Sequence, residues 1–312
     1  MDRYFRALII ICLLAISAPA QAAIKYKGSA DFVAVNAVQY KAESAFYAVM
    51  PKAWSGSVWY SLILEYLYFV MFGQSNVAYV GDAGPGSTLI ALKSIELFND
   101  NTVDNDGLTG ISGNTNDRWC RGRGPWIGFA HRMEDAYNQK VIIHVLGVGG
   151  SGLWVESGSL KIFDYAGWGY WLDDLWPVAK TEINDGMTYL TTQGYNYTFA
   201  GFIMFMGVND SLAISNGYQT KATYKEKLHT LIDDAVTVYP NTHFWIIEQA
   251  PQGGAYNTVA DAQTEVCADR EDATICYFNS YTDEWIYSWH YLQSRYDEIG
   301  QKSADNIWGY LQ

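Results

Sequence analysis

Basic residues are scarce in this sequence. The 312 residues include 20 Lys and Arg against 33 Asp and Glu, which gives a formal net charge of −13. Binding to nucleic acid or to an anionic membrane surface depends on clustered Lys and Arg. The charge balance therefore argues against both kinds of partner.

The sequence also lacks an apolar run long enough to span a membrane comfortably. Its most apolar segment, "ALIIICLLAIS", is about half the length that a spanning helix needs. Arg3 and Arg6 precede this run, and the small residues Ala20 and Ala22 follow it, as is typical of a secretory signal. We predict a signal peptide over residues 1–22, with a buried N-terminal helix as the alternative. Its removal would leave 290 residues with a net charge of −14 in the periplasm or medium, without membrane insertion.

Cysteine is rare, with four residues in the chain. Cys12 lies in the predicted signal, and Cys267 and Cys276 enclose the short polar segment "CADREDATIC". In an oxidising compartment the last two predict a local disulfide, with two reduced thiols as the alternative. Cys120 is then unpaired.

Internal repeats and low-complexity linkers are also lacking, so residues 23–312 are predicted to form a single domain. Residues 23–60 within it are an N-terminal extension or an added strand, for which "ADFVAVNAVQY" is the candidate. Short apolar runs bounded by turn residues predict strands buried on both faces. These runs are "LYFVMF" (67–72), "KVIIHVLGV" (140–148), "FAGFIMFMGV" (199–208) and "THFWIIEQA" (242–250).

Two amphipathic segments between the predicted strands indicate helices. Residues 125–139 and 223–239 each place their apolar side chains near one face. Strands that alternate with helices imply a parallel sheet covered on both sides. The predicted fold is α/β, a three-layer α/β/α sandwich around a central, mostly parallel sheet.

Small and polar residues follow three of the predicted strands. The segments are "GQSN" (73–76), "GGSG" (149–152) and "GVND" (207–210). Because reactive groups in such sheets collect at the carboxyl ends of the strands, we expect these distant loops to meet. Ser75 lies in the first of them.

These loops contain hydrogen-bond donors of the kind that a serine nucleophile needs. A serine hydroxyl requires a base to take its proton, and fixed donors must bind the oxyanion that forms. The backbone N–H of Gly149 or Gly150, the side chain of Asn209 and the N–H of Ser75 itself are candidate donors. The alternative for all of these residues is a purely structural role in turns and helix caps.

The blocks "GQSN", "GGS" and "GVND", followed by "WHYLQSRYDEIGQKSADNI", resemble the SGNH hydrolases. The sequence is most similar to carbohydrate esterases of the sialate O-acetylesterase type, over residues 67–308. The resemblance implies that Ser75 is the nucleophile and His290 the general base. It also implies that Asn209 and Gly149 or Gly150 form the oxyanion hole with Ser75.

The sequence departs from the family at two positions. Related enzymes carry an Asp three residues before the catalytic His, where this chain has Tyr287. Because the orienting group sets the tautomer of the base, we expect a Ser-His dyad or a relocated acid, with Asp283 the leading candidate before Glu284 and Glu248. The second departure is "MGVND", which follows the broader SGNH pattern and leaves the particular sugar open.

Two further segments are weaker site candidates. "DNTVDNDGLTG" (100–110) is dense in Asp and Asn, but its spacing favours a solvated loop over a calcium loop. "RWCRGRGP" (118–125) concentrates three arginines, which suit either a carboxylate on an acidic sugar or nearby acidic side chains. No metal or cofactor is predicted.

The sequence thus predicts an exported serine esterase that removes O-acyl groups, acetyl in particular, from a carbohydrate. Aromatic residues form 16% of the chain, and some of them would suit sugar rings at the rim of a cleft. The alternatives are a lipid or thioester hydrolase with the same site and a carbohydrate-binding protein on an inactive hydrolase scaffold.

Overall fold

The computed structural model describes residues 65–77, 87–98, 109–112, 124–148, 150–153, 171–280, 285–287 and 290–312, together with four short strands nearer the N-terminus. The chain divides into two compact units, residues 1–64 and residues 65–312. In the first unit β1 (Lys25–Lys27) pairs with β2 (Phe32–Ala34), and β3 (Ala53–Ser55) pairs with β4 (Val58–Tyr60), both antiparallel. The candidate strand within residues 30–40 thus includes β2, whose partner is β1. The predicted signal peptide lies outside the described residues.

A seven-stranded sheet is the centre of the second unit. In spatial order its strands are β11 (Ala273–Tyr277), β10 (His243–Ile247), β9 (Tyr197–Phe205), β5 (Tyr66–Gly73), β8 (Val141–Gly147), β6 (Ile90–Phe98) and β7 (Thr109–Ser112). Neighbouring strands are parallel except for β7, which runs antiparallel to β6 at the edge. The predicted mostly parallel sheet is confirmed.

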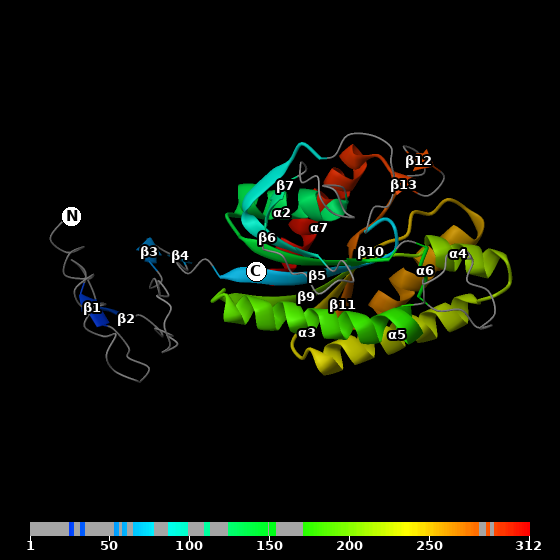
Figure 1. Ribbon diagram of the computed structural model, residues 1–312, viewed down its shortest axis with the longest axis horizontal. Coiled ribbons are helices and arrows are strands. Elements are labelled where there is room, and N and C mark those ends of the chain that lie inside the picture. The colour runs from blue at the N-terminus through cyan, green and yellow to red at the C-terminus, as the bar shows by residue number, and fades with distance from the viewer. Residues whose placement is uncertain are drawn as a thin grey trace. The chain divides into compact units, whose positions relative to one another are not determined.

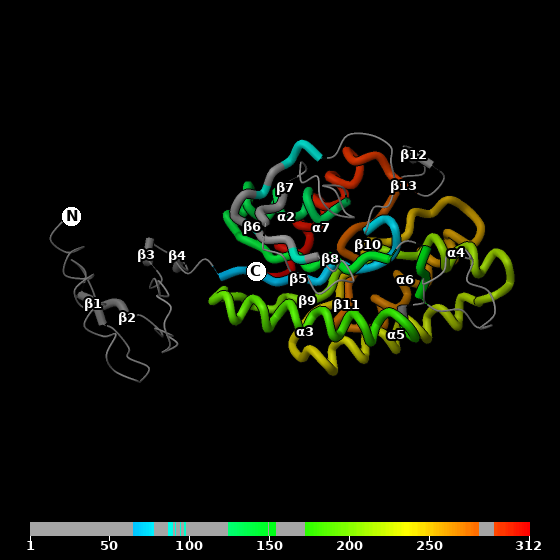
Figure 2. Tube along the Cα trace, viewed as in Figure 1, coloured from blue at the N-terminus to red at the C-terminus, as the bar shows by residue number. Residues whose placement is uncertain are grey.

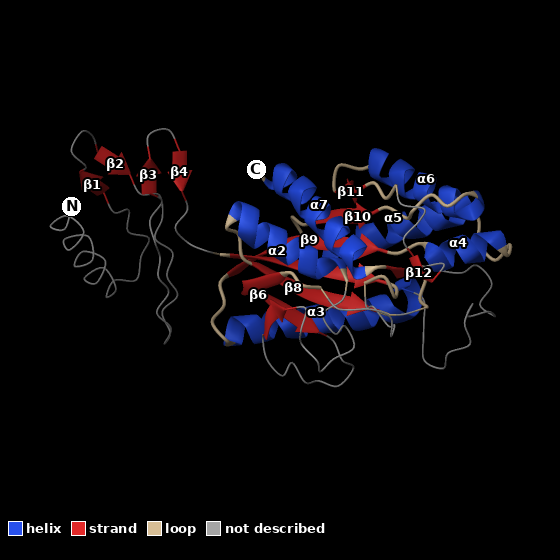
Figure 3. Cartoon of the chain, turned by 90° about the horizontal axis from the view of Figure 1, so that it is seen from above, coloured by secondary structure: helices blue, strands red, loops and turns tan. Residues whose placement is uncertain are grey.

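Helices cover both faces of this sheet (Figure 1). The described helices are α2 (Pro125–Tyr137), α3 (Trp176–Thr192), α4 (Val208–Ser215), α5 (Lys221–Val238), α6 (Gly254–Ala268) and α7 (Gln293–Leu311), with a short π-helix, η1 (Trp171–Leu175), before α3. On one face α2 and α7 contact each other and lie side by side (Figure 3). On the other face lie α3, α5 and α6. The three-layer sandwich predicted from the sequence is confirmed.

The central strand β5 shows why both faces need a cover. Successive side chains of a strand point to opposite faces. Tyr68, Val70 and Phe72 join the core beneath α3, α5 and α6. Phe69 and Met71 join the core beneath α2 and α7. All five side chains are buried, which is why this segment of the sequence is a continuous apolar run rather than an alternating one.

The strand order creates a switch point beside β5. The chain places β8 on one side of β5 and then crosses to place β9 on the other, so the trace of β5 runs between them (Figure 2). Gly73 at the end of β5 is level with Gly147 of β8 and Phe205 of β9. In open α/β sheets ligands bind at the carboxyl ends of strands where the order reverses. The topology therefore brings the loops that follow β5, β8 and β9 together.

The predicted disulfide is wrong in this structure. Cys267 lies in the last turn of α6, Cys276 lies in β11, and both thiols are free. The sequence predicts a loop between the two cysteines. In the structure α6 continues to Ala268 and β11 begins at Ala273, so each cysteine lies in a regular element and only a short connection separates them. The Cys276 thiol is buried and donates to the carbonyl of Ile246 over 3.4 Å. Burial raises the pKa of each thiol to about 12.

None of the helices within the described residues has the length and apolar character required to cross a membrane.

Candidate active site

Ser75 lies in the tight turn that follows β5. The strand ends at Gly73, and the N–H of Val77 donates to the carbonyl of Gln74 over 2.8 Å, which closes the turn around the serine. Gln74 and Asn76 on either side are buried, whereas Ser75 is partly exposed. The turn therefore presents the serine hydroxyl at the carboxyl edge of the sheet and directs its two amide neighbours inward.

Gly73 permits the close approach of β9 beneath this turn. Its φ is +153°, and a Cβ atom at this position would lie 2.2 Å from the carbonyl oxygen of Phe205. A real Cβ contact at that distance is sterically impossible without a shift of one backbone. The glycine of "GQSN" is thus required by the packing of two neighbouring strands.

We expect Gly73→Ala to lower the free energy of unfolding by at least about 3 kcal/mol, because backbone strain and a steric clash add. Gly217→Ala is the matched control, since Gly217 also has a positive φ (+76°) but has open space around it. The control should lose only about 1 kcal/mol from the left-handed backbone. Urea unfolding of both variants checks this expectation, and equal losses would contradict the argument from the clash.

His290 reaches Ser75 from the other end of the chain. It begins β13 (His290–Tyr291), which pairs with β12 (Trp285–Tyr287) and immediately precedes α7. Its Nε2 atom lies 2.7 Å from Oγ of Ser75, although 215 positions separate the two residues. This is a direct hydrogen bond at the distance that proton transfer requires. Burial lowers the pKa of His290 below its usual value, so the imidazole is neutral at neutral pH.

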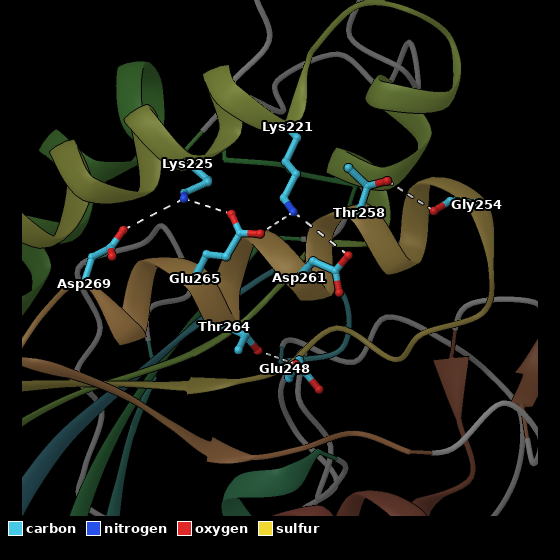
Figure 4. Close-up of polar contacts among 9 residues, drawn as sticks. All are labelled: Lys221, Lys225, Glu248, Gly254, Thr258, Asp261, Thr264, Glu265 and Asp269. Atoms are coloured by element: carbon cyan, nitrogen blue, oxygen red, sulfur yellow. Dashed lines mark hydrogen bonds and ion pairs between the residues drawn. The ribbon is translucent and has the colours of Figure 1, made fainter.

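The group that orients His290 was expected at Asp283. Asp283 and Glu284 lie outside the described residues. Glu248, the remaining acidic candidate, follows β10, and its carboxylate accepts a hydrogen bond of 2.8 Å from the hydroxyl of Thr264 on α6 (Figure 4). Glu248 is thus directed toward α6, on the side away from the ion pairs that Glu265 makes with Lys221 and Lys225 (Figure 4).

Asn209 occupies the first turn of α4, directly after β9. Its side chain is buried, and Nδ2 donates to the carbonyl oxygen of Ser151 over 2.7 Å. This bond fixes the amide between the loops that follow β8 and β9, and it uses one of the two Nδ2 hydrogens. Gly150 lies in the same β8 loop with a φ of +72°. Gly149 lies outside the described residues.

Asp210 makes a second link between these loops. It is buried, and its Oδ1 accepts the backbone N–H of Leu153 over 2.9 Å. Gly152 approaches so closely that a Cβ atom there would lie 3.3 Å from the same oxygen. The Asn-Asp pair of "GVND" therefore binds the loop after β8 through both side chains, at Ser151 and at Leu153, the residue that follows "GGSG".

Gln74 and Asn76 are site residues to which the sequence argument gave no role. Oε1 of Gln74 accepts the backbone N–H groups of Gly207 and Asn209 over 3.3 and 3.5 Å. Oδ1 of Asn76 accepts the hydroxyl of Tyr296 on α7 over 2.7 Å. Each residue of the Gln-Ser-Asn triplet thus binds a different segment: the β9 loop, the histidine and α7. Their position inside the "GQSN" block was the available signal.

Two weaker candidate segments lie largely outside the described residues: the Asp- and Asn-rich segment 100–110 and the Arg-rich segment 118–125. Their predicted roles stay predictions. The described residues include no group of three His, Cys, Asp or Glu side chains placed to hold a metal ion.

Comparison with known proteins supports the fold. No protein-family model matches the sequence, and no curated protein matches it. A solved protein structure from Arabidopsis thaliana is similar, with 14% identity and a TM-score of 0.54, over 78% of this chain and 98% of that one. NanS is similar with 11% identity and a TM-score of 0.51, over 79% of this chain and 98% of that one. A carbohydrate acetylesterase from Sinorhizobium meliloti has 13% identity and a TM-score of 0.44, over 78% and 99% of the two chains.

At these identities the first two structures establish a shared architecture rather than a shared activity. The chain has the three-layer α/β/α fold that the sequence predicts, and these two proteins share it. What this particular chain does has to be argued from its own site.

Proposed function

We propose that this protein is a serine esterase that removes O-acyl groups, in particular O-acetyl groups, from a carbohydrate. The observation that supports the proposal most directly is the hydrogen bond of 2.7 Å between Ser75 and His290 at the switch point of the sheet. A serine hydroxyl bound to a partly buried neutral imidazole, beside loops rich in N–H donors, is the arrangement that acyl transfer uses.

In the proposed first step Oγ of Ser75 attacks the carbonyl carbon of the ester, and Nε2 of His290 takes the hydroxyl proton. The carbonyl oxygen becomes an oxyanion in the tetrahedral intermediate. His290 then donates its proton to the sugar oxygen as the bond from that oxygen to the acyl carbon breaks. The sugar leaves, and the acyl group stays on Ser75. A water molecule, deprotonated by His290, attacks the acyl-enzyme in the same manner, which releases the carboxylic acid and restores the serine.

Three donors are proposed to bind the oxyanion: the backbone N–H of Ser75, that of Gly150 or Gly149, and the side-chain amide of Asn209. Nδ2 of Asn209 carries two hydrogens, and its bond to Ser151 occupies only one. The same bond fixes the amide before substrate arrives. Donors that need no reorganisation during the reaction give the largest stabilisation of a developing charge.

Asp283 is proposed as the group that orients His290. Related enzymes use an Asp three residues before the histidine for this role, and this chain has Tyr287 at that position. The choice of a carbohydrate is supported by the sequence resemblance and by the high content of Tyr and Trp, whose flat rings suit the C–H faces of sugars. The signal-like segment at the N-terminus supports export, to the periplasm or the medium.

The experiment compares four substrates with one enzyme preparation: an aryl acetate, an O-acetylated sugar, a long-chain aryl ester and an acyl thioester. Higher kcat/KM for the acetylated sugar than for the long-chain ester and the thioester supports the proposal. A preference for the long-chain ester or thioester would indicate a lipid or thioester hydrolase instead. Sugar binding without hydrolysis even of the aryl acetate would indicate an inactive scaffold.

The pH dependence of kcat/KM tests the role of His290. Only the neutral imidazole accepts the serine proton, so activity is lost as the pH falls through the pKa of this residue. Because burial lowers that pKa, the neutral form persists to lower pH than it would for an exposed histidine, whose pKa is about 6.5. We therefore expect the acid limb of the pH profile to have its midpoint below about 6.5. A midpoint clearly above that value would contradict the assignment of His290 as the base.

A further inference from the structure

The hydroxyl of Tyr296 connects the two residues that follow the proposed nucleophile and base. Tyr296 lies in the first turns of α7 and is fully buried. Its hydroxyl donates to Oδ1 of Asn76 over 2.7 Å and accepts the backbone N–H of Tyr291 over 3.3 Å. Asn76 follows Ser75, and Tyr291 follows His290. We propose that Tyr296 is a positioning residue that holds the serine turn and the histidine strand at proton-transfer distance.

This inference rests on the proposed function, and the placement of β13 shows why such a link is needed. The serine turn is fixed by the central sheet, because β5 has parallel partners on both sides. Within the described residues β13 pairs only with the short strand β12, outside that sheet. Sheet hydrogen bonds therefore do not set the distance between His290 and Ser75.

The helix that carries Tyr296 is itself rigidly placed. Gly300 of α7 packs so closely on α2 that a Cβ atom there would lie 1.9 Å from the carbonyl oxygen of Pro125. Tyr296 also contacts the ring of Tyr291 edge-on, with centroids 5.7 Å apart. A hydroxyl on a well-packed helix is a fixed reference point, and it bonds to both segments with its single hydrogen and one lone pair.

Tyr291 completes the attachment of the histidine strand. Its ring stacks on Phe205 at the end of β9, with centroids 6.3 Å apart and the planes at 20°. Its hydroxyl accepts a hydrogen bond of 2.9 Å from Nδ2 of Asn279, just beyond β11. The side chain of Tyr291 thus fixes β13 to the sheet, and its backbone N–H fixes it to Tyr296. Only the contact with Tyr296 also connects β13 to the serine turn, because the same hydroxyl donates to Asn76.

The test replaces Tyr296 by Phe, which keeps the ring and removes the hydroxyl. For aryl acetate hydrolysis we expect kcat to fall about 10- to 100-fold with KM nearly unchanged, because small displacements of reacting groups cost rate rather than binding. Tyr68→Phe is the matched control. Tyr68 is equally buried, and its hydroxyl bonds to His144 over 2.8 Å in the core on the other face of the sheet. The control should retain the wild-type kcat.

A double-mutant cycle with Asn76→Ala separates positioning from general loss of structure. If the two side chains act through their shared hydrogen bond, the double variant should be little slower than the slower single variant. Thermal unfolding identifies the folded fraction of each variant. Should Tyr296→Phe not fold, Asn76→Ala alone carries the test against Tyr68→Phe.

The inference would be overturned if Tyr296→Phe and Asn76→Ala had the same kcat as Tyr68→Phe. It would also be overturned if the losses of the two single variants multiplied in the double variant. Either result would leave the esterase proposal intact. If the wild-type protein hydrolysed no ester, or if its hydrolysis did not depend on Ser75, both the inference and the esterase proposal would be overturned.

Discussion

Replacing Ser75 by alanine should lower kcat for aryl acetate hydrolysis by about 10⁴- to 10⁶-fold. The substitution removes the Oγ atom that lies 2.7 Å from Nε2 of His290, and no acyl-enzyme can form without it. The proposed oxyanion donors remain, so slow hydrolysis by water is the expected residual activity. Because Ser75 is partly exposed within its turn, the change creates no large cavity and the fold should be retained.

Ser211→Ala is the control for this variant. Ser211 is a buried serine near the site, but its hydroxyl donates to the carbonyl oxygen of Gly207, the N-cap residue of its helix, rather than to a base. Its loss should leave kcat near the wild-type value. A serine-directed organophosphorus reagent provides a second readout. Its phosphoryl group, after loss of the reagent's leaving group, should add mass to the wild type and to Ser211→Ala but not to Ser75→Ala. Equal rates for wild type and Ser75→Ala would remove the serine from the mechanism.

The strands that could be predicted from the sequence are the ones buried on both faces. β5, β8, β9 and β10 appear in the sequence as unbroken apolar runs, because helices cover both of their sides. The other three strands of the sheet, β6, β7 and β11, were not predicted. The sequence of β6 includes Lys93 and Glu96, and β11 is a short strand at the edge of the sheet that follows four charged residues. Edge position weakens the apolar pattern on which such predictions depend.

The meeting of the three loops at one edge of the sheet was predictable, whereas the side-chain hydrogen bonds between them were not. Parallel strands necessarily place their carboxyl ends together, so Ser75, Gly150 and Asn209 were expected at one edge. That Gln74 binds the β9 loop and Asn76 binds α7 depends on side-chain contacts between segments more than a hundred residues apart. Local sequence patterns do not encode such contacts. The same limit explains the wrong disulfide, because spacing alone does not determine where helix and strand end.

His290 carries the second large expected effect. We expect His290→Ala to lower kcat for aryl acetate hydrolysis by about 10⁴- to 10⁶-fold, because under the proposed mechanism the serine hydroxyl then has no base and the leaving group has no acid. His229→Ala is the matched control. His229 is a partly buried histidine on α5, where its Nδ1 lies 3.4 Å from Nη1 of Arg270, and its removal should leave kcat unchanged.

Combining His290→Ala with Ser75→Ala distinguishes a joint role from two separate ones. If the two residues act as one nucleophilic unit, the double variant should be no slower than either single variant, since each single change already abolishes the same step. Added imidazole should restore part of the activity of His290→Ala, because a free base can enter the space that the side chain leaves, but it should not help Ser75→Ala. Multiplicative losses, or rescue of the serine variant, would show that the close contact between these two side chains is not the centre of the reaction.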